Sequence, residues 1–195
     1  MIEAKNTRDK IVKLSIQLMS QKGFNNTGIS EILALANVPK GSFYHYFKSK
    51  DDLGFAIIEQ YGNNLVGGVE QFLSESSLPP LQRVRAYFDW AIDYFAGDFA
   101  LCNCLLGNLA QELATQHPAL REAVFAYYQK IEGVIANEFK AAQGDGTLSL
   151  SLDANALAKY LFSGWEGALV RAKLEQSLEP VKQYLQLFFE HTIKV

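Results

Sequence analysis

The sequence predicts an all-α protein, and three features of the chain lead to that prediction. Apolar residues recur at intervals of three and four over most of the 195 residues, which is the spacing that places them on one face of a helix. Proline, glycine and asparagine interrupt this pattern where helices should end. Alternation of the β type is confined to residues 147–152, too short to found a sheet. We therefore expect about nine helices and no internal repeat.

The first two predicted helices are closely spaced. The first covers about residues 7–21 and ends before Gly23, whose missing Cβ suits a left-handed cap. Thr27 is expected to cap the second helix, and Asn37 to end it.

A third helix of about two turns is expected to begin at Pro39, because proline suits the first turn of a helix. Phe43 and Phe47 lie four residues apart and are expected to pack inward, which leaves the residues around them for a partner. Two short helices joined by a tight turn are the layout of a DNA-reading motif.

The fourth predicted helix is long, covering about residues 50–73, and Ser49 is positioned to cap it. Gly62 and two further glycines lie inside it, so it should bend there or allow close packing. Serines and prolines mark a linker over residues 74–80. Beyond the linker, further helices are expected over about residues 79–96, 101–114, 118–142, 153–174 and 178–193.

Charge is distributed unevenly along the chain. The formal net charge is −3, but residues 1–52 carry eight Lys or Arg against five Asp or Glu, a net +3, and the remainder carries −6. A basic N-terminal region suits contact with phosphates, which supply most sequence-independent affinity for nucleic acid. Because +3 is modest, we expect a dimer that doubles the contacts with DNA.

Composition argues against a membrane or secreted protein. No run of about eighteen apolar residues occurs, and the N-terminus lacks the apolar core of a signal peptide. A cytoplasmic protein without membrane contact is expected. The two cysteines, Cys102 and Cys104, are too close together for a stabilising disulfide.

Residues 38–53, VPKGSFYHYFKSKDDL, follow the segment GFNNTGISEI and a first helix at a fixed distance. Together, over roughly residues 7–55, they resemble the N-terminal domain of tetracycline-repressor-type (TetR family) transcriptional regulators. The resemblance implies a helix-turn-helix DNA-binding domain over residues 1–49. It also implies a linking helix over residues 50–73 and an effector-binding and dimerisation domain over residues 50–195.

In that family the third helix lies in the major groove. Carried over residue by residue, those nearest the base edges would be Lys40, Gly41, Ser42 and Tyr44. Those that would mainly position the protein on phosphates are Thr27, Tyr44, His45, Tyr46, Lys48 and Lys50.

Some of these residues have an alternative interpretation. Tyr44 and Tyr46 could instead pack against the first helix. A metal-binding role for His45 is disfavoured, because no carboxylate or cysteine accompanies it at ligand spacing.

Residues 101–113, LCNCLLGNLAQEL, and 162–174, FSGWEGALVRAKL, resemble the branch of the family that contains the acrylate-utilisation and N-ethylmaleimide repressors. The correspondence places Cys104 at that branch's cysteine. A thiol near a helix N-terminus has a larger thiolate fraction, which is the condition for attack on an electrophile. Cys104 is therefore either a sensor of a reactive electrophile or unsaturated carboxylate, or a small apolar core residue.

An effector pocket can be assembled around Cys104 from aromatic and polar residues of the fourth to eighth helices. They are Tyr61, Phe88, Tyr94, Phe95, Asn108, Gln111, Glu112, Tyr128, Trp165 and Arg171. Because aromatic residues are more often core than ligand cage, only some of them are expected to line a cavity. Arg171 could bind a carboxylate, or pair with Glu112 or Glu166.

The last two predicted helices are candidates for a subunit interface. The residues proposed for it are Leu157, Tyr160, Leu161, Gly164, Ala168, Tyr184 and Phe188. One apolar face could serve the core, whereas the other needs a cover, which a two-fold contact between four helices would provide. The alternative is that these helices are buried in their own domain.

These observations predict a homodimeric repressor that a small molecule releases from a palindromic, double-stranded DNA operator. An enzyme is disfavoured, since the chain has no Ser-His-Asp set, no glycine-rich phosphate loop and no Cys/His metal spacing. No cofactor is expected. The remaining alternative is a helical adaptor that binds protein and not DNA.

Overall fold

The computed structural model describes residues 2–193, with side chains at residues 7–99 and 101–193. Within this part of the chain every regular element is a helix and no strand occurs, as the sequence predicts. Residues 147–152, the candidate β segment, form turns and bends. The two predicted domains include residues 1, 194 and 195, which lie outside the described residues.

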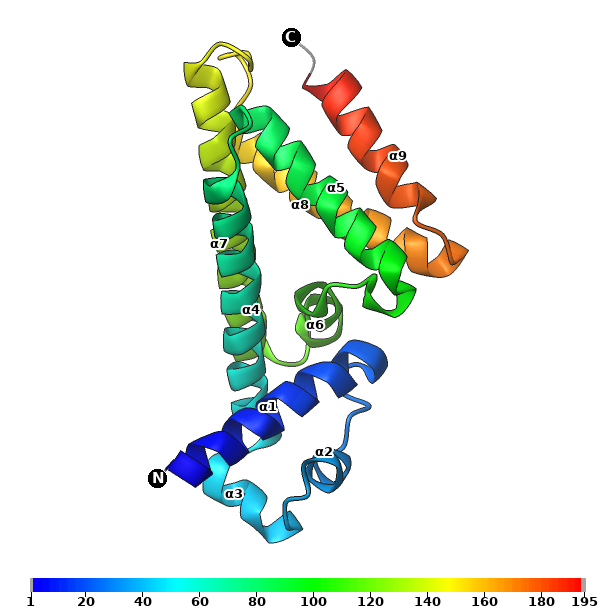
Figure 1. Cartoon of the computed structure of the whole chain (residues 1–195). Coiled ribbons are helices and arrows are strands. Elements are labelled where there is room, and N and C mark those ends of the chain that lie inside the picture. Colours follow the sequence, from blue (N-terminus) through cyan, green and yellow to red (C-terminus); the bar gives the residue numbers. More distant parts are fainter. Residues whose placement is uncertain (1, 194–195) are drawn as a thin grey trace. The chain divides into compact units, whose positions relative to one another are not determined.

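The helices follow one another with short connections (Figure 1). The N-terminal ones are α1 (Ile2–Lys22), α2 (Ile29–Ala36), the 3-10 turn η1 (Lys40–Ser42), α3 (Phe43–Tyr46) and α4 (Lys50–Glu75). The next are α5 (Pro80–Gly97), the 3-10 turn η2 (Phe99–Leu101), α6 (Leu105–Leu113) and α7 (Pro118–Gly144). The last are α8 (Ala154–Glu175), α9 (Glu179–Leu187) and a π-helical turn, η3 (Phe188–Thr192).

The chain divides into two compact units. Unit 1 comprises the residues up to Leu65 together with Cys104–Tyr127, and unit 2 comprises Val66–Asn103 and the residues from Tyr128 onward. The domain boundary that the sequence predicts after residue 49 lies inside unit 1, because α6 packs against α1. As a boundary between functional domains it stays a prediction.

Local chemistry explains where the first helices of unit 1 end. Gly23 has φ +81°, the left-handed conformation expected of it, and closes α1. Asn37 ends α2 in the same way with φ 53°. The cap of α2 was predicted wrongly: it is Gly28, not Thr27. The Thr27 hydroxyl is fully buried and donates backwards to the Gly23 carbonyl oxygen at 2.7 Å.

The start of α4 is fixed by a reciprocal pair of side-chain bonds. The Asp52 N–H donates to the Ser49 hydroxyl oxygen at 3.1 Å, and the Lys48 N–H donates to the Asp52 carboxylate at 2.9 Å. This confirms Ser49 as the cap and resembles a capping box, which satisfies two otherwise orphaned amides.

Within unit 1, α4 and α7 pack closely at Gly62. The ring of Tyr127 occupies the space that a Cβ on Gly62 would need. The Tyr127 hydroxyl donates to the Asn63 side-chain oxygen at 2.8 Å and to the Glu59 carbonyl at 3.3 Å. Burial raises the pKa of Tyr127, so the hydroxyl stays protonated as a donor. The glycine therefore serves close packing, one of the two roles expected for it.

In unit 2, α8 and α9 are joined through Tyr184. Its hydroxyl donates to the carbonyl oxygens of Tyr160 at 2.8 Å and Leu161 at 3.0 Å, and its ring lies where a Cβ on Gly164 would stand. Burial raises the pKa of Tyr184 strongly.

Helix α8 itself begins at an Asp153 cap, whose carboxylate accepts hydrogen bonds from two backbone amides, close to the predicted start.

Two predicted helices have different bounds in the structure. The helix expected over residues 101–114 is α6, which begins only at Leu105 because a 3-10 turn and an extended residue, Cys104, precede it. The helix expected over residues 178–193 changes to a π-helical turn after Leu187.

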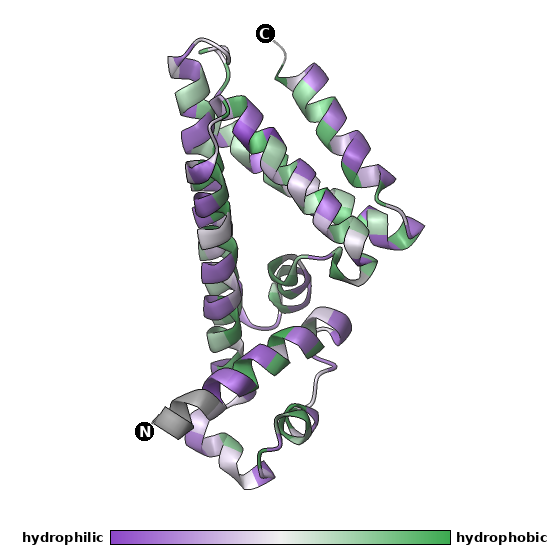
Figure 2. Cartoon of the chain, viewed as in Figure 1, coloured by the Kyte–Doolittle hydropathy of each residue, from purple (hydrophilic) through white to green (hydrophobic). Residues whose placement is uncertain are grey.

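Apolar and polar residues interleave along the long helices, as the bands of colour in Figure 2 show. Among the described residues, no helix is both long and apolar enough to cross a membrane.

Candidate functional site

The helix-turn-helix segment is built on two buried phenylalanines. After Asn37, Pro39 leads into the η1 turn, and α3 follows without a break. Phe43 and Phe47 are almost fully buried, with ring centroids 5.6 Å apart, which confirms the inward face expected for them. Lys40, Gly41, Tyr44 and His45 are consequently left exposed.

Tyr44 is the most prominent outward residue, with 72% of its surface exposed. It touches the edge of the Phe43 ring but is not packed into the core. Lys40, Gly41 and His45 are exposed as well, and nothing lies within 4 Å of the position a Cβ on Gly41 would take. A surface of hydroxyl, ammonium and imidazole donors around an open backbone suits phosphates and base edges.

The other predicted DNA contacts are placed in different ways. Lys48 is exposed, whereas Ser42 and Tyr46 are half-buried. Thr27 is buried, and its N–H is directed to the Phe24 carbonyl at 3.3 Å. Lys50 is half-buried: its ammonium donates to the Asn25 carbonyl at 3.3 Å and lies 4.7 Å from the centre of the Phe24 ring.

The Lys50 ammonium interacts with the carboxylates near the turn that contains Asn25. Burial lowers its pKa, although the carboxylates of Glu112 and Asp51 oppose that shift. The side chains of Lys50 and Thr27 both bond to groups of their own unit. The phosphate contact that the sequence predicts for them stays a prediction.

Sequence reasoning missed Arg8 as a member of this surface. Its guanidinium lies over the Phe47 ring at 5.1 Å from the centroid, next to α3, and the residue is exposed. The cluster of basic residues in α1 was the available signal.

The second candidate region of unit 1 is the start of α6. Cys104 is the N-cap residue of this helix, with φ −113° and ψ 120°, so it does stand at a helix N-terminus as expected. It is 9% exposed. The first amide of the helix, on Leu105, donates to the Tyr61 hydroxyl oxygen at 3.3 Å. This contact brings two of the predicted effector residues, Cys104 and Tyr61, into one neighbourhood.

Cys102 lies in unit 2 and differs from Cys104 in its surroundings. It is 1% exposed, and burial raises the pKa of its thiol despite the opposing charge of Lys173. A raised pKa keeps the thiol protonated and unreactive at neutral pH.

The remaining effector candidates of unit 1 lie further along α6. Asn108 is half-buried and Gln111 is exposed. The carboxylate of Glu112 accepts bonds from the backbone amides of Phe24 and Asn25, in the turn between α1 and α2. Glu112 thus faces a protein turn rather than an open cavity.

In unit 2 the aromatic candidates form a packed cluster around Trp165. Its ring lies 4.9 Å from that of Phe88 and 6.2 Å from that of Phe95. Tyr128 instead meets Phe162, with centroids 5.0 Å apart. Tyr94 is half exposed and stacks on Trp90.

Arg171 does not make either of the ion pairs that the sequence suggested. Its guanidinium pairs with Glu175 at 2.6 Å, one helical turn away, and is largely exposed. Neither Glu112 nor Glu166 is that partner, because the i,i+4 neighbour is closer at hand. A role for Arg171 in binding an effector carboxylate stays a prediction.

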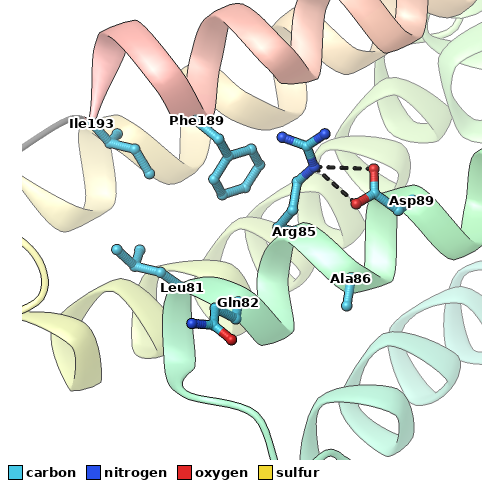
Figure 3. Close-up of a pocket in the computed structure, with 7 residues that line it drawn as sticks. All are labelled: Leu81, Gln82, Arg85, Ala86, Asp89, Phe189 and Ile193. Atoms are coloured by element: carbon cyan, nitrogen blue, oxygen red, sulfur yellow. Dashed lines mark hydrogen bonds and ion pairs between the residues drawn. The ribbon is translucent and has the colours of Figure 1, made fainter.

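One cavity of about 380 Å³ lies in unit 2, between the first half of α5 and the η3 turn (Figure 3). It is lined by Leu81, Gln82, Arg85, Ala86, Asp89, Phe189 and Ile193. None of the effector candidates is among them. Its charged groups satisfy each other, since Arg85 donates to both Asp89 oxygens at 2.9–3.0 Å and lies over the Phe189 ring.

The predicted subunit interface is divided by burial. Leu157, Leu161 and Phe188 are buried within the chain, and Phe188 stacks on Phe139. Gly164 and Ala168 are half-buried, as is Tyr184. Tyr160 is 55% exposed. The sequence analysis did not single out Val170 and Leu174, which are exposed apolar residues on α8. Leu187, one of the apolar residues expected on the last helix, is exposed on α9.

No metal site is suggested by the geometry of the described side chains, because no three His, Cys, Asp or Glu residues come together there.

Two family descriptions match the chain. "Bacterial regulatory proteins, tetR family" matches residues 11–57, and "Tetracyclin repressor-like, C-terminal domain" matches residues 80–188. The transcriptional regulator AcuR of Cereibacter sphaeroides is 35% identical over 191 residues, which are 98% of this chain and 87% of AcuR.

Two solved structures share the fold along nearly the whole chain. The regulatory protein TetR from Rhodobacter sphaeroides superposes with a TM-score of 0.87 at 36% identity, covering 94% of this chain and 97% of that one. The reduced form of NemR from Escherichia coli gives a TM-score of 0.83 at 28% identity, covering 92% and 94% respectively.

Proposed function

This chain belongs to the TetR family of bacterial regulatory proteins, and from this premise we propose a homodimeric repressor that a small molecule releases from a palindromic operator. It acts in the cytoplasm, with no catalytic role and no cofactor. One observation supports the DNA-binding part above all others: α3 holds Tyr44 largely exposed beside the buried Phe43 and Phe47.

In this proposal α3 enters the major groove of DNA. Lys40, Gly41, Ser42 and Tyr44 approach the base edges, while His45, Tyr46 and Lys48 contact phosphates. The second subunit reads the second half-site, about 34–36 Å or a small multiple of that further along the duplex. Arg8 adds a phosphate contact beside α3.

The DNA contacts can be tested with two single substitutions. We expect Tyr44→Ala and Lys48→Ala each to weaken operator binding by roughly 10-fold or more, because each removes a contact in both subunits. Lys48→Ala should also flatten the dependence of affinity on salt, since it removes a phosphate contact. Titrated gel shifts with the chain's own upstream DNA at several salt concentrations measure both effects.

Phe125→Ala is the matched control, because Phe125 is another exposed aromatic residue of unit 1, at 58%. Wild-type affinity in Tyr44→Ala would contradict the placement of α3 in the groove. An intact dimer that binds no DNA at low salt would favour the protein-binding adaptor instead.

Release requires an effector that binds the released form better than the DNA-bound form. A preference of a few kcal/mol is enough to shift the population from bound to free. In the dimer, the effector changes the separation of the two α3 helices, so that they no longer match the half-sites.

Cys104 is the residue proposed to sense an electrophilic effector. Its thiolate sulfur adds to the β-carbon of an α,β-unsaturated carbonyl, the π pair moves to the α-carbon, and water protonates that carbon. A thioether results, and no oxidant is consumed. The position of Cys104 at the N-terminus of α6 supports this step, because the helix dipole stabilises the thiolate.

Mass spectrometry after mild treatment with N-ethylmaleimide tests the sensing role. We expect one adduct per chain, on Cys104, together with loss of operator binding, and neither effect in Cys104→Ser. Cys102→Ser is the control and should behave as wild type, since burial keeps the Cys102 thiol protonated. Release of DNA while Cys104 stays unmodified would exclude covalent sensing.

A further inference from the structure

Glu112, near the C-terminal end of α6, binds the turn between α1 and α2. One carboxylate oxygen accepts the Phe24 N–H at 3.2 Å, and the other accepts the Asn25 N–H at 3.0 Å. Two consecutive backbone amides thus share one carboxylate. Bonds to an ionised acceptor are about twice as strong as neutral ones, so this contact holds the turn firmly.

The turn is shaped to receive that carboxylate. Gly23 precedes Phe24 and has φ +81°, a conformation that favours glycine. A Cβ at this position would overlap the Glu112 carboxylate. Gly23 is therefore needed for its backbone conformation and also for the space that Glu112 occupies.

The start of α4 holds the same turn through Lys50. Its ammonium donates to the Asn25 carbonyl and lies over the Phe24 ring. The edge of His117, just before α7, meets that ring at 5.9 Å, and its Nδ1 lies 3.3 Å from the Asp51 carboxylate. Side chains from α4, α6 and the α6–α7 connection therefore converge on Phe24 and Asn25.

The turn leads directly to the DNA-reading motif. Thr27 follows Asn25 by two residues and is tied back to the Gly23 carbonyl, and Gly28 then caps α2. These two contacts lie between Asn25 and the first residue of α2, so a displacement of the turn is passed on to α2.

Helix α6 also carries the proposed sensing residue. Cys104 caps its N-terminus and Glu112 stands near its other end, so about 12 Å of helix separates the two. A short, regular helix moves as a rigid body. Because a hydrogen bond is lost beyond about 3.5 Å, a shift of α6 by about 1 Å must either carry the turn along or break both amide bonds.

We propose that Glu112 is the positioning residue that transmits movement of α6 to the helix-turn-helix. This inference rests on the proposed function, and it assigns Glu112 to protein-internal coupling rather than to the effector. The competing possibility is that Glu112 only stabilises the turn and has no influence on DNA binding. The two possibilities differ in operator affinity and effector response, not in stability.

The test uses the full-length dimer with Glu112→Gln and Glu112→Ala, and with Glu122→Gln as the matched control. Glu122 is an exposed carboxylate on α7 in unit 1, 76% exposed, and is paired only loosely with Arg121 at 3.7 Å. Three quantities are measured: amide exchange at Phe24 and Asn25, operator affinity without effector, and the loss of affinity after alkylation with N-ethylmaleimide.

In Glu112→Ala we expect exchange at both amides to accelerate by about 10-fold, since each loses its acceptor. In Glu112→Gln we expect this at one of the two amides, because the side chain keeps a single acceptor oxygen. Operator affinity should fall by about 10-fold, and alkylation should then change it by less than about 3-fold, because the link from α6 is gone. The Glu122→Gln control should match wild type in all three measurements. Glu112→Gln keeps the shape of the side chain, so it guards against misfolding in Glu112→Ala.

Faster exchange with unchanged affinity and a wild-type response to alkylation would show that Glu112 only stabilises the turn, and would overturn the proposal. Unchanged exchange would overturn the contact itself. If the wild-type protein binds no operator, the proposed function fails, whereas wild-type binding with an unaffected Glu112→Gln variant sinks only this inference.

Discussion

Replacing Leu174 by glutamate is expected to separate the dimer and to weaken operator binding by at least about 100-fold. Leu174 is 81% exposed near the end of α8, although it is a large apolar residue. It shares a face with Tyr160, Gly167 and Val170, because neighbouring positions in this set are three, four or seven residues apart. All four are exposed in the single chain.

This face has the composition of a helix–helix interface. Gly167 has no neighbour within 4 Å of a Cβ position, so a second helix can approach there, and the larger apolar residues flank it. Exposed Leu187 on α9 can extend the contact. A carboxylate at position 174 would be buried without a partner in the dimer, which costs several kcal/mol in each subunit.

In the proposed dimer, operator affinity depends on both subunits, because each of them reads only one half-site. Linking two modules raises affinity by about 10²–10⁴ over one module, and a monomer forfeits that gain. Analytical ultracentrifugation gives the oligomeric state, and a gel shift at the same protein concentration gives the affinity.

Leu150→Glu is the control, since Leu150 is equally exposed, at 82%, but lies in the connection after α7. It should remain dimeric and bind DNA normally. A Leu174→Glu protein that sediments as a dimer would exclude this face as the subunit interface.

Phe43→Ala is expected to lower the free energy of unfolding by about 3–5 kcal/mol, the range for a buried phenylalanine. The Phe43 side chain has no exposed surface and contacts the rings of Phe47 and Tyr44. The cavity cannot be refilled easily, because α3 has only four residues and Phe43 is the buried one among them. Operator binding should be lost along with the packing that holds Tyr44 outward.

Denaturant unfolding followed by circular dichroism at fixed protein concentration measures this effect, since dimer stability depends on concentration. Phe125→Ala, at an exposed position, should cost less than about 1 kcal/mol. A Phe43→Ala protein as stable as this control would contradict the inward packing of α3.

The sequence predicted the features that depend on local rules. Gly23 and Asn37 were predictable helix ends, because glycine and asparagine tolerate the left-handed conformation better than most residues. Ser49 was a predictable cap, because its hydroxyl reaches the amide three residues further on. The inward pair Phe43 and Phe47 follows from helical spacing alone. Such patterns involve residues close in the chain, so no tertiary knowledge is needed.

The features that the sequence could not predict depend on distant partners. Glu112 lies 87 residues from Asn25 in the chain, and nothing near it indicates a bond to that turn. Thr27 satisfied the rule for a helix cap, but its hydroxyl instead donates to the carbonyl oxygen of Gly23. The Arg171–Glu175 ion pair is a different case. It was not predicted, although its i,i+4 spacing is visible in the sequence.

The Tyr127 ring on Gly62 restricts how α4 and α7 can move within unit 1. Sliding one helix along the other by a single residue, about 1.5 Å, would drive the ring into neighbouring backbone and break its bonds to Asn63 and Glu59. The contact therefore opposes shear between these helices and favours their movement together.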